Sequence, residues 1–290
     1  RRTRVIGNVR AFGAISLGLA TLGMPWLARA LSFDGGGETT GTGWTLAVLA
    51  TSAAGMALFL LAFAVPRERP SALARPRPRM RELARTLARN TPLLLVLLGS
   101  VLGFGRYVVQ AGGAVFVVVA YGDEGLFTLI GAAIIAGLVI ASFLTPLVAR
   151  RVGGRALVIG SSLAGAVLYL AMYIVGFASI LPIVVFIFLT GLTLGVFLVV
   201  QATMIADAVD DAERRTGIRN DGISFATLTF VSKIMSALAV LVFGMFVVLA
   251  GYEDGVVVTP AMQDVVFAAI TIVPAISCLL SAVPFAFVRL

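Results

Sequence analysis

The chain has 290 residues, of which 60% are hydrophobic and only 12% are charged, and its mean hydropathy is +1.05. Soluble domains average roughly 45–50% apolar residues, so this composition excludes a soluble globular protein and indicates a membrane protein built of helices. A net charge of +8 is compatible with nucleic-acid binding, but the basic residues lie where membrane topology places them, so we expect no nucleic-acid partner. One cysteine excludes an internal disulfide, and without histidine we expect no zinc or haem site.

Long apolar segments recur along the whole chain, and a bilayer core requires about 20 helical residues per crossing. The third segment is longer than a membrane is thick, so we expect it to tilt or to extend into the external interface. The predicted fold class is an all-α membrane protein with eight spans, at residues 11–31, 44–65, 92–121, 126–148, 156–177, 180–206, 223–250 and 262–288.

Residues 66–90, PRERPSALARPRPRMRELARTLARN, form the predicted linker. Its proline-rich first half cannot be helical, whereas residues 80–89 place apolar side chains on one helical face and arginines on the other, which is typical of an interfacial helix. We expect a basic connector held at the lipid surface, with a regulatory docking site as the alternative. The predicted domains are residues 1–65 with two helices, the linker at 66–90, and a six-helix bundle at 91–290.

The positive-inside rule predicts the orientation of the spans. If alternate connections are cytoplasmic, starting with the N-terminal RRTR, they hold 19 of the 22 basic residues. The opposite connections carry acidic residues such as Asp123, Glu124 and Glu253. Both ends are therefore predicted to face the cytoplasm. The chain starts without an initiator methionine or a signal peptide, and we expect it to be a fragment.

The arrangement of two spans, a long connector and six further spans resembles part of a major facilitator transporter, whose two halves are repeats. The two leading spans would be the fifth and sixth helices of the first half. The expected fold is therefore a major facilitator fold lacking its first four helices. RRVGGR (150–155) also resembles the basic-and-glycine loop signature of this superfamily, although the usual leading aspartate is absent.

Three cations fall within predicted spans: Arg29, Arg106 and Lys233. A charge inside a membrane costs free energy and marks a functional site or a buried pair. Arg29 lies near a span end, where its side chain can reach the interface. Arg106 and Gln110 form a polar face on the glycine-rich stretch GFGRYVVQAGG, which predicts either the lining of an aqueous cavity or a structural pairing.

Lys233 is the only lysine among 22 basic residues, and it lies about 15 Å from the cytoplasmic end of its span at 1.5 Å per residue. Lysine is a compact point charge, unlike the planar fork of arginine. We predict a functional site that needs this smaller group; a structural lysine bound to backbone carbonyls is the alternative. Since no Asp or Glu lies at matching depth, we expect the counter-charge from other helices, from substrate, or from the carboxylate ligands of a coupled cation.

Residues 206–222, ADAVDDAERRTGIRNDG, contain eight charged residues among seventeen. We predict a cytoplasmic loop whose ion pairs with neighbouring loops break and re-form during alternating access. The alternative is a solvated loop whose pairs each contribute about 0–1 kcal/mol. The predicted gating network comprises Asp207, Asp210, Glu213, Arg214, Arg215, Arg219 and Asp221, together with Arg151 and Arg155 of another loop.

The segment from 204 to 233 resembles the glycoside–pentoside–hexuronide:cation symporters, the melibiose permease-like family. In that family the tenth helix ends in M-x-A-D-x-V-D-x-x-E, followed by a basic/glycine turn, an arginine, an acidic residue and a helix with a central lysine. These positions are occupied by Met204, Ala206, Asp207, Val209, Asp210, Glu213, Gly217, Arg219, Asp221 and Lys233. YGDEGLF (121–127) resembles the family's external turn between its seventh and eighth helices, and RRTRVIGNVR (1–10) resembles its loop into the fifth helix.

The resemblance implies cation-coupled symport of a sugar or glycoside by alternating access in a bacterial inner membrane. It implies Na⁺ or H⁺ as the coupling ion, no other cofactor, and no metal site within this chain; we further expect a monomer. Lys233, Arg10 and Thr229 are implied to lie near the sugar. Arg106 and Gln110 complete the predicted substrate site.

One departure from the family concerns the aromatic residue of its tenth helix, which stacks on the sugar. This chain has Leu198 at that position, with Phe197 adjacent. The resemblance therefore does not extend to sugar stacking on this helix.

Three other functions were weighed. A major facilitator carrier for a drug or lipid-like solute remains open, because one fold serves many substrates. A non-transporting truncated remnant also remains open. We expect no enzyme, because the sequence has no histidine, no paired carboxylates within the spans and no serine nucleophile motif.

Overall fold

The computed structural model describes residues 2–33, 40–64, 88–216, 221–253 and 256–288. All secondary structure in these ranges is helical, as the sequence predicts, and eight helices are long and apolar enough to cross a membrane. The elements are α1 (Arg2–Ala30), α2 (Gly41–Ala64), α4 (Thr91–Leu102), η1 (Phe104–Tyr107), α5 (Val108–Tyr121), α6 (Leu126–Val152), α7 (Gly154–Val175), α8 (Ile180–Thr216), α9 (Asp221–Ala250) and α10 (Pro260–Phe287).

The chain divides into two compact units, one of residues 16–79 and one formed by residues 1–15 with 80–290. In the smaller unit, α1 and α2 are joined through Ser32. The Ser32 hydroxyl donates to Ala28 O at 2.7 Å and accepts from the backbone N–H of Thr40 at 2.9 Å. Most of the large apolar side chains of α2 are exposed, which suits a surface in lipid.

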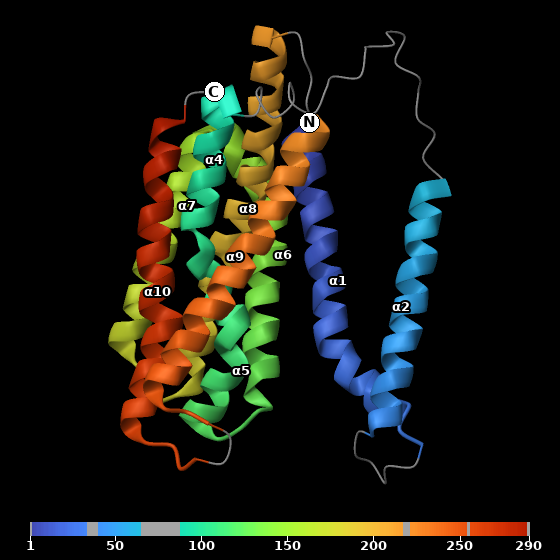
Figure 1. Ribbon diagram of the computed structural model, residues 1–290. Coiled ribbons are helices and arrows are strands. Elements are labelled where there is room, and N and C mark those ends of the chain that lie inside the picture. The colour runs from blue at the N-terminus through green and yellow to red at the C-terminus, as the bar shows by residue number, and fades with distance from the viewer. Residues whose placement is uncertain (1, 34–39, 65–87, 217–220, 254–255, 289–290) are drawn as a thin grey trace. The chain divides into compact units, whose positions relative to one another are not determined.

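The larger unit gathers α4 to α10 into one bundle (Figure 1). Its tightest helix pair is α6 with α8, because glycines let the two backbones touch. A Cβ atom on Gly191 would lie 2.5 Å from Ile134 O, and one on Gly137 would overlap Phe188 O. The start of α4 is fixed by Asn90, whose side chain accepts from Leu93 N at 3.1 Å and donates to Ala208 O of α8 at 2.9 Å.

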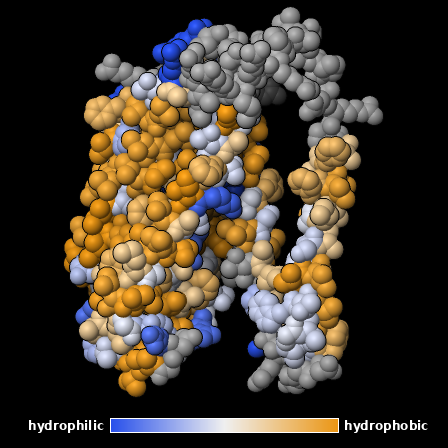
Figure 2. Space-filling view, in the orientation of Figure 1, coloured by the Kyte–Doolittle hydropathy of each residue, from blue (hydrophilic) through white to orange (hydrophobic). Residues whose placement is uncertain are grey.

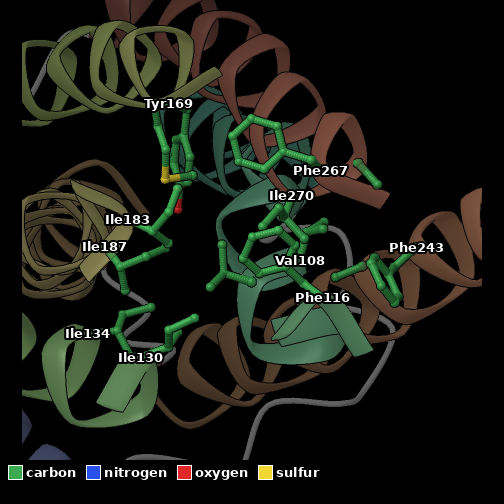
Figure 3. Packing of buried hydrophobic residues seen from close by; sticks show 14 of the residues in the cluster. Val108, Phe116, Ile130, Ile134, Tyr169, Ile183, Ile187, Phe243, Phe267 and Ile270 are labelled. Carbon is green, nitrogen blue, oxygen red and sulfur yellow. The ribbon is translucent and has the colours of Figure 1, made fainter. Parts of the chain in front are cut away.

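Two hydrophobic clusters fill the bundle. One contains Phe116, Ile187, Phe243 and Phe267, and Figure 3 shows their rings and branched chains meeting from α5, α8, α9 and α10. The other contains residues such as Leu97, Phe197, Met235 and Phe285. Phe104 and Tyr107 of η1 pack against both clusters, so η1 lies where the two clusters meet.

The face of the bundle that Figure 2 shows is largely hydrophobic along its length, with a hydrophilic patch about midway. The exposed polar side chains of α9 include Thr229, Lys233 and Ser236.

The structure corrects three details of the predicted elements. The third span is not one tilted helix but is interrupted at Gly103 and η1. The charged stretch from residue 206 is not a loop, because α8 continues to Thr216. The opening RRTRVIGNVR is not a loop into a helix, because α1 begins at Arg2. The predicted interfacial helix of the linker lies outside the described residues, apart from its last two positions.

Candidate functional site

The break between α4 and α5 is held by serines of α10. Ser277 Oγ donates to Leu102 O at 2.6 Å and accepts from Gly105 N at 2.8 Å. Ser281 Oγ donates to Gly99 O at 2.7 Å. A helix can break at membrane depth only where neighbours satisfy the released backbone groups, and these two hydroxyls do so.

Arg106 lies at this break and is buried, with only 2% of its surface exposed. Its Nη2 donates to Ser162 Oγ of α7 at 2.7 Å, and its Nη1 to Ser281 Oγ of α10 at 3.2 Å. A longer contact of 3.5 Å joins Nη1 to Gly103 O. Of the two readings of Arg106, this position favours the structural pairing over the lining of an aqueous cavity.

The face of the guanidinium is covered by Phe197 of α8, whose ring centroid lies 4.0 Å from Cζ. Phe197 also meets Phe285 edge-on, with the ring centroids 5.9 Å apart, and has no exposed surface. A ring that has no exposed surface and carries a guanidinium on its face cannot also stack on a sugar. Leu198 is half-buried and packs against both hydrophobic clusters, so α8 presents no free aromatic platform at these positions.

Lys233 is exposed on α9, and it makes no hydrogen bond or ion pair with the residues that the structure describes. Its depth follows from a contact between α5 and α9, where a Cβ on Gly112 would overlap the ring of Phe243. The two helices run in the same direction (Figure 1), so counting back ten residues from this contact places Lys233 near the level of Leu102 and Gly103. Lys233 therefore lies at about the depth of the break, outside the packed interior.

The other predicted substrate residues take different positions. Thr229, one turn before Lys233, is exposed, and its hydroxyl donates to Phe225 O at 3.0 Å. Gln110 is exposed on the first turn of α5. Arg10 is half-buried on α1.

These positions form two groups. Arg106 belongs to the interior network of the bundle. Lys233, Thr229 and Gln110 lie on exposed helix faces. The serines and Phe197 were missed from the sequence, although the four-residue spacing of Ser277 and Ser281 on an apolar helix placed two hydroxyls on one face.

The predicted gating residues lie at the ends of helices rather than in one loop. Asp207, Asp210 and Glu213 occupy the last three turns of α8, and Arg214 and Arg215 are exposed at its end. Arg215 Nε pairs with Asp211 Oδ2 at 3.0 Å within the same helix. Arg219 lies outside the described residues, and Asp221 begins α9.

The two arginines of the other predicted loop differ from each other. Arg151 is exposed in the last turn of α6. Arg155, in the first turn of α7, donates through Nη2 to Ala286 O in the last turn of α10. A cation at this end of α10 neutralises the partial negative charge of its free carbonyls.

Comparisons with known proteins agree with this architecture. A family model described as MFS/sugar transport protein matches residues 1–290. The glucuronide carrier protein homolog of Escherichia coli (strain K12) is 28% identical over 233 residues, which are 80% of this chain and 50% of that protein. The inner membrane symporter YicJ of the same organism is 36% identical over 119 residues, which are 41% of this chain and 26% of that protein.

The chain spans about half the length of the first of these relatives. The family match extends over the whole sequence, and the charged motif at the end of α8 with the lysine of α9 has the spacing described above. The chain therefore belongs to the MFS/sugar transport family, as one of the glycoside–pentoside–hexuronide:cation symporters of the major facilitator superfamily.

Proposed function

We propose that this chain forms part of a secondary active transporter that carries a sugar or glycoside by alternating access, coupled to Na⁺ or H⁺. The observation that carries the proposal is Lys233, a cation halfway along a membrane helix that is exposed and has no ion pair among the described residues. A charge in that position needs water and an opposite charge, and a transport pathway supplies both.

The proposed pathway lies along the exposed faces that carry Lys233, Thr229 and Gln110. Within the described spans no carboxylate lies at the depth of Lys233. The negative charge then comes from the substrate or from acids elsewhere in the whole protein, including those that hold the coupling cation. One relative is named a glucuronide carrier protein homolog, so an acidic glycoside belongs in any substrate panel.

We further propose that the charged end of α8 serves as part of a cytoplasmic gate. Asp207, Asp210 and Glu213 extend past the apolar part of α8, with arginines beside them. At 1.5 Å per residue the 37 residues of α8 span about 55 Å, whereas a bilayer core is about 30 Å thick. These charges can thus pair with cytoplasmic segments that move. The proposal places the protein in a bacterial inner membrane, with both ends of this chain cytoplasmic.

Uptake by the full-length protein tests the proposal. Cells or vesicles would be given labelled neutral and acidic glycosides, with and without a Na⁺ gradient, and with a protonophore to remove the proton gradient. We expect uptake of at least one glycoside to depend on one of the two gradients.

In the same assay, Lys233→Ala is expected to lower cation-dependent uptake roughly 10- to 100-fold, because a hydrogen bond made by a charged group contributes about 1.5–3 kcal/mol. Leu241→Ala, an exposed apolar position two turns along α9, is the control and should keep uptake near the original rate. Unchanged gradient-driven uptake in Lys233→Ala, at equal protein in the membrane, contradicts the proposal.

A further inference from the structure

Arg106 is the only charged side chain that is buried among the described residues, and the transport proposal gives it no part. All its contacts are with neutral groups: two hydroxyls, one carbonyl and one aromatic ring. An arginine kept for charge neutralisation would have a carboxylate partner. The contacts of Arg106 instead depend on the planar shape of the guanidinium, which donates hydrogen bonds from its edge and stacks through its face.

The contacts of Arg106 join four parts of the bundle. Arg106 stands on η1, its two terminal nitrogens reach Ser162 of α7 and Ser281 of α10, and its face lies on Phe197 of α8. Ser281 in turn binds Gly99 O on the other side of the break. The guanidinium thus connects the two sides of the break with α7, α8 and α10.

Gln110, which belongs to the proposed pathway, follows Arg106 closely in the sequence. Tyr107 completes η1, and Val108 and Val109, the first residues of α5, are buried. Gln110 is exposed one turn later. Since a broken helix lacks the stiffness of a continuous hydrogen-bonded one, the direction of this segment depends on what anchors the break.

We propose that Arg106 is a positioning residue: its guanidinium, held by Ser162, Ser281 and the ring of Phe197, fixes the break so that the first turn of α5 presents Gln110 to the substrate. The proposal rests on the proposed function for the identity of the ligand. It does not rest on it for the anchoring itself, which can be measured without transport.

Arginine suits this role and lysine does not. The planar fork donates in two directions while its face stacks on an aromatic ring, whereas an ammonium group offers a point charge. Arg106→Lys keeps the charge and removes the fork, so it separates the positioning role from a purely electrostatic one.

The test uses the full-length protein in detergent or nanodiscs with three variants. These are Arg106→Lys, the double variant Ser162→Ala with Ser281→Ala, and Ser161→Ala as the control. Ser161 is the buried neighbour of Ser162, and its hydroxyl bonds only to Val158 O of its own helix. Two measurements are made: hydrogen exchange of backbone amides at residues 99–110 and in α6, and glycoside affinity alongside maximal transport rate.

For Arg106→Lys and the double serine variant, we expect exchange at residues 99–110 to become about tenfold faster while α6 is unchanged, because opening is local to the break. We expect the affinity for glycoside to fall about tenfold or more per folded molecule, because small displacements of a positioned group are costly. Ser161→Ala should change neither quantity.

Several results would overturn the proposal. Arg106→Lys with the original exchange and affinity shows that the charge alone matters. Faster exchange that is equal in α6 and at the break shows a general loss of stability. Faster exchange at the break with unchanged affinity shows an anchor that positions nothing. If the unmodified protein binds no glycoside, the proposed function is wrong. The anchoring by Arg106 is then judged from hydrogen exchange alone, and unchanged exchange at residues 99–110 in Arg106→Lys rejects it.

Discussion

Two cations lie near the same depth of the bundle, and their surroundings differ completely. Arg106 is enclosed by hydroxyls and an aromatic ring, whereas Lys233 is exposed and has no partner among the described residues. A forked, delocalised cation suits an enclosed site with several weak acceptors, and a compact ammonium suits a site that exchanges partners. The chain's single lysine thus lies at an exposed position, whereas an arginine occupies the enclosed one.

Phe197 gives a prediction at the level of one side chain. In Phe197→Leu the guanidinium of Arg106 loses its ring, and Phe285 loses an edge-on neighbour. A large buried side chain is also replaced by a smaller one. We expect the variant to lose about 1–3 kcal/mol of stability, from the lost cation–π contact and the cavity left behind.

Thermal unfolding of the full-length protein in detergent measures this loss. Leu198→Ala is the matched control, since it shortens the adjacent, half-buried side chain without touching the Arg106 contact. A smaller loss in Phe197→Leu than in Leu198→Ala contradicts the importance of the ring.

The sequence reveals the position of Lys233 within its span but not the partners of Arg106, for a physical reason. A lone lysine in an apolar span is visible in the sequence because its depth follows from counting along one helix. The partners of Arg106 come from positions 162, 197 and 281, and only the packing of four helices brings them together. Phe197 lies beside the position at which the family has its sugar-stacking aromatic residue. In the bundle interior, however, its ring stacks on the guanidinium of Arg106.

The broken helix is the element whose form the sequence did not reveal. Residues 92–121 are mostly apolar, and no proline lies at the break. Gly103 and Gly105 are present, but many glycines in membrane helices serve close packing instead. What makes the break stable is Ser277, which lies over 170 residues away in the sequence.

Ser277→Ala tests how far the break depends on α10. The variant leaves Gly105 N–H and Leu102 C=O without their shared hydroxyl. Each buried group left unpaired costs about 1–3 kcal/mol, so we expect a measurable loss of thermal stability in detergent. Ser142→Ala is the control, because that buried hydroxyl donates only to Leu138 O within α6. Equal losses of stability in the two variants would show that the hydrogen bonds of Ser277 across the break contribute no more than a hydroxyl bonded within one helix.

The charged C-terminal part of α8 shows why a charged stretch can be predicted as a loop although it is helical. Charge density predicted a solvated connection, but ADAVDDAERRT is also rich in alanine, glutamate and arginine, which favour helix. Asp211 and Arg215 are spaced to pair on one helical face, and they do so at 3.0 Å. Periodicity and propensity were therefore better guides here than polarity.

At the level of the whole chain, hydropathy was sufficient to find eight spans. Each predicted span overlaps a helix that is long and apolar enough to cross a membrane, because the bilayer sets the length of such segments directly. Boundaries were less accurate where helices extend beyond the bilayer, as α8 does. The division of the chain into a leading pair of helices, a linker and a six-helix bundle stays a prediction.

Orientation in the membrane is the last property that the charges predict. The loop with Asp123 is expected to face outward, and the end of α6 with Arg151 is expected to face the cytoplasm, because basic residues are retained on that side. Both side chains are exposed. In a background without other cysteines, Asp123→Cys in intact cells should react with a membrane-impermeant maleimide. Arg151→Cys should react only after the membrane is permeabilised. The reverse pattern would place both ends of the chain outside the cytoplasm and would remove the charged end of α8 from any cytoplasmic gate.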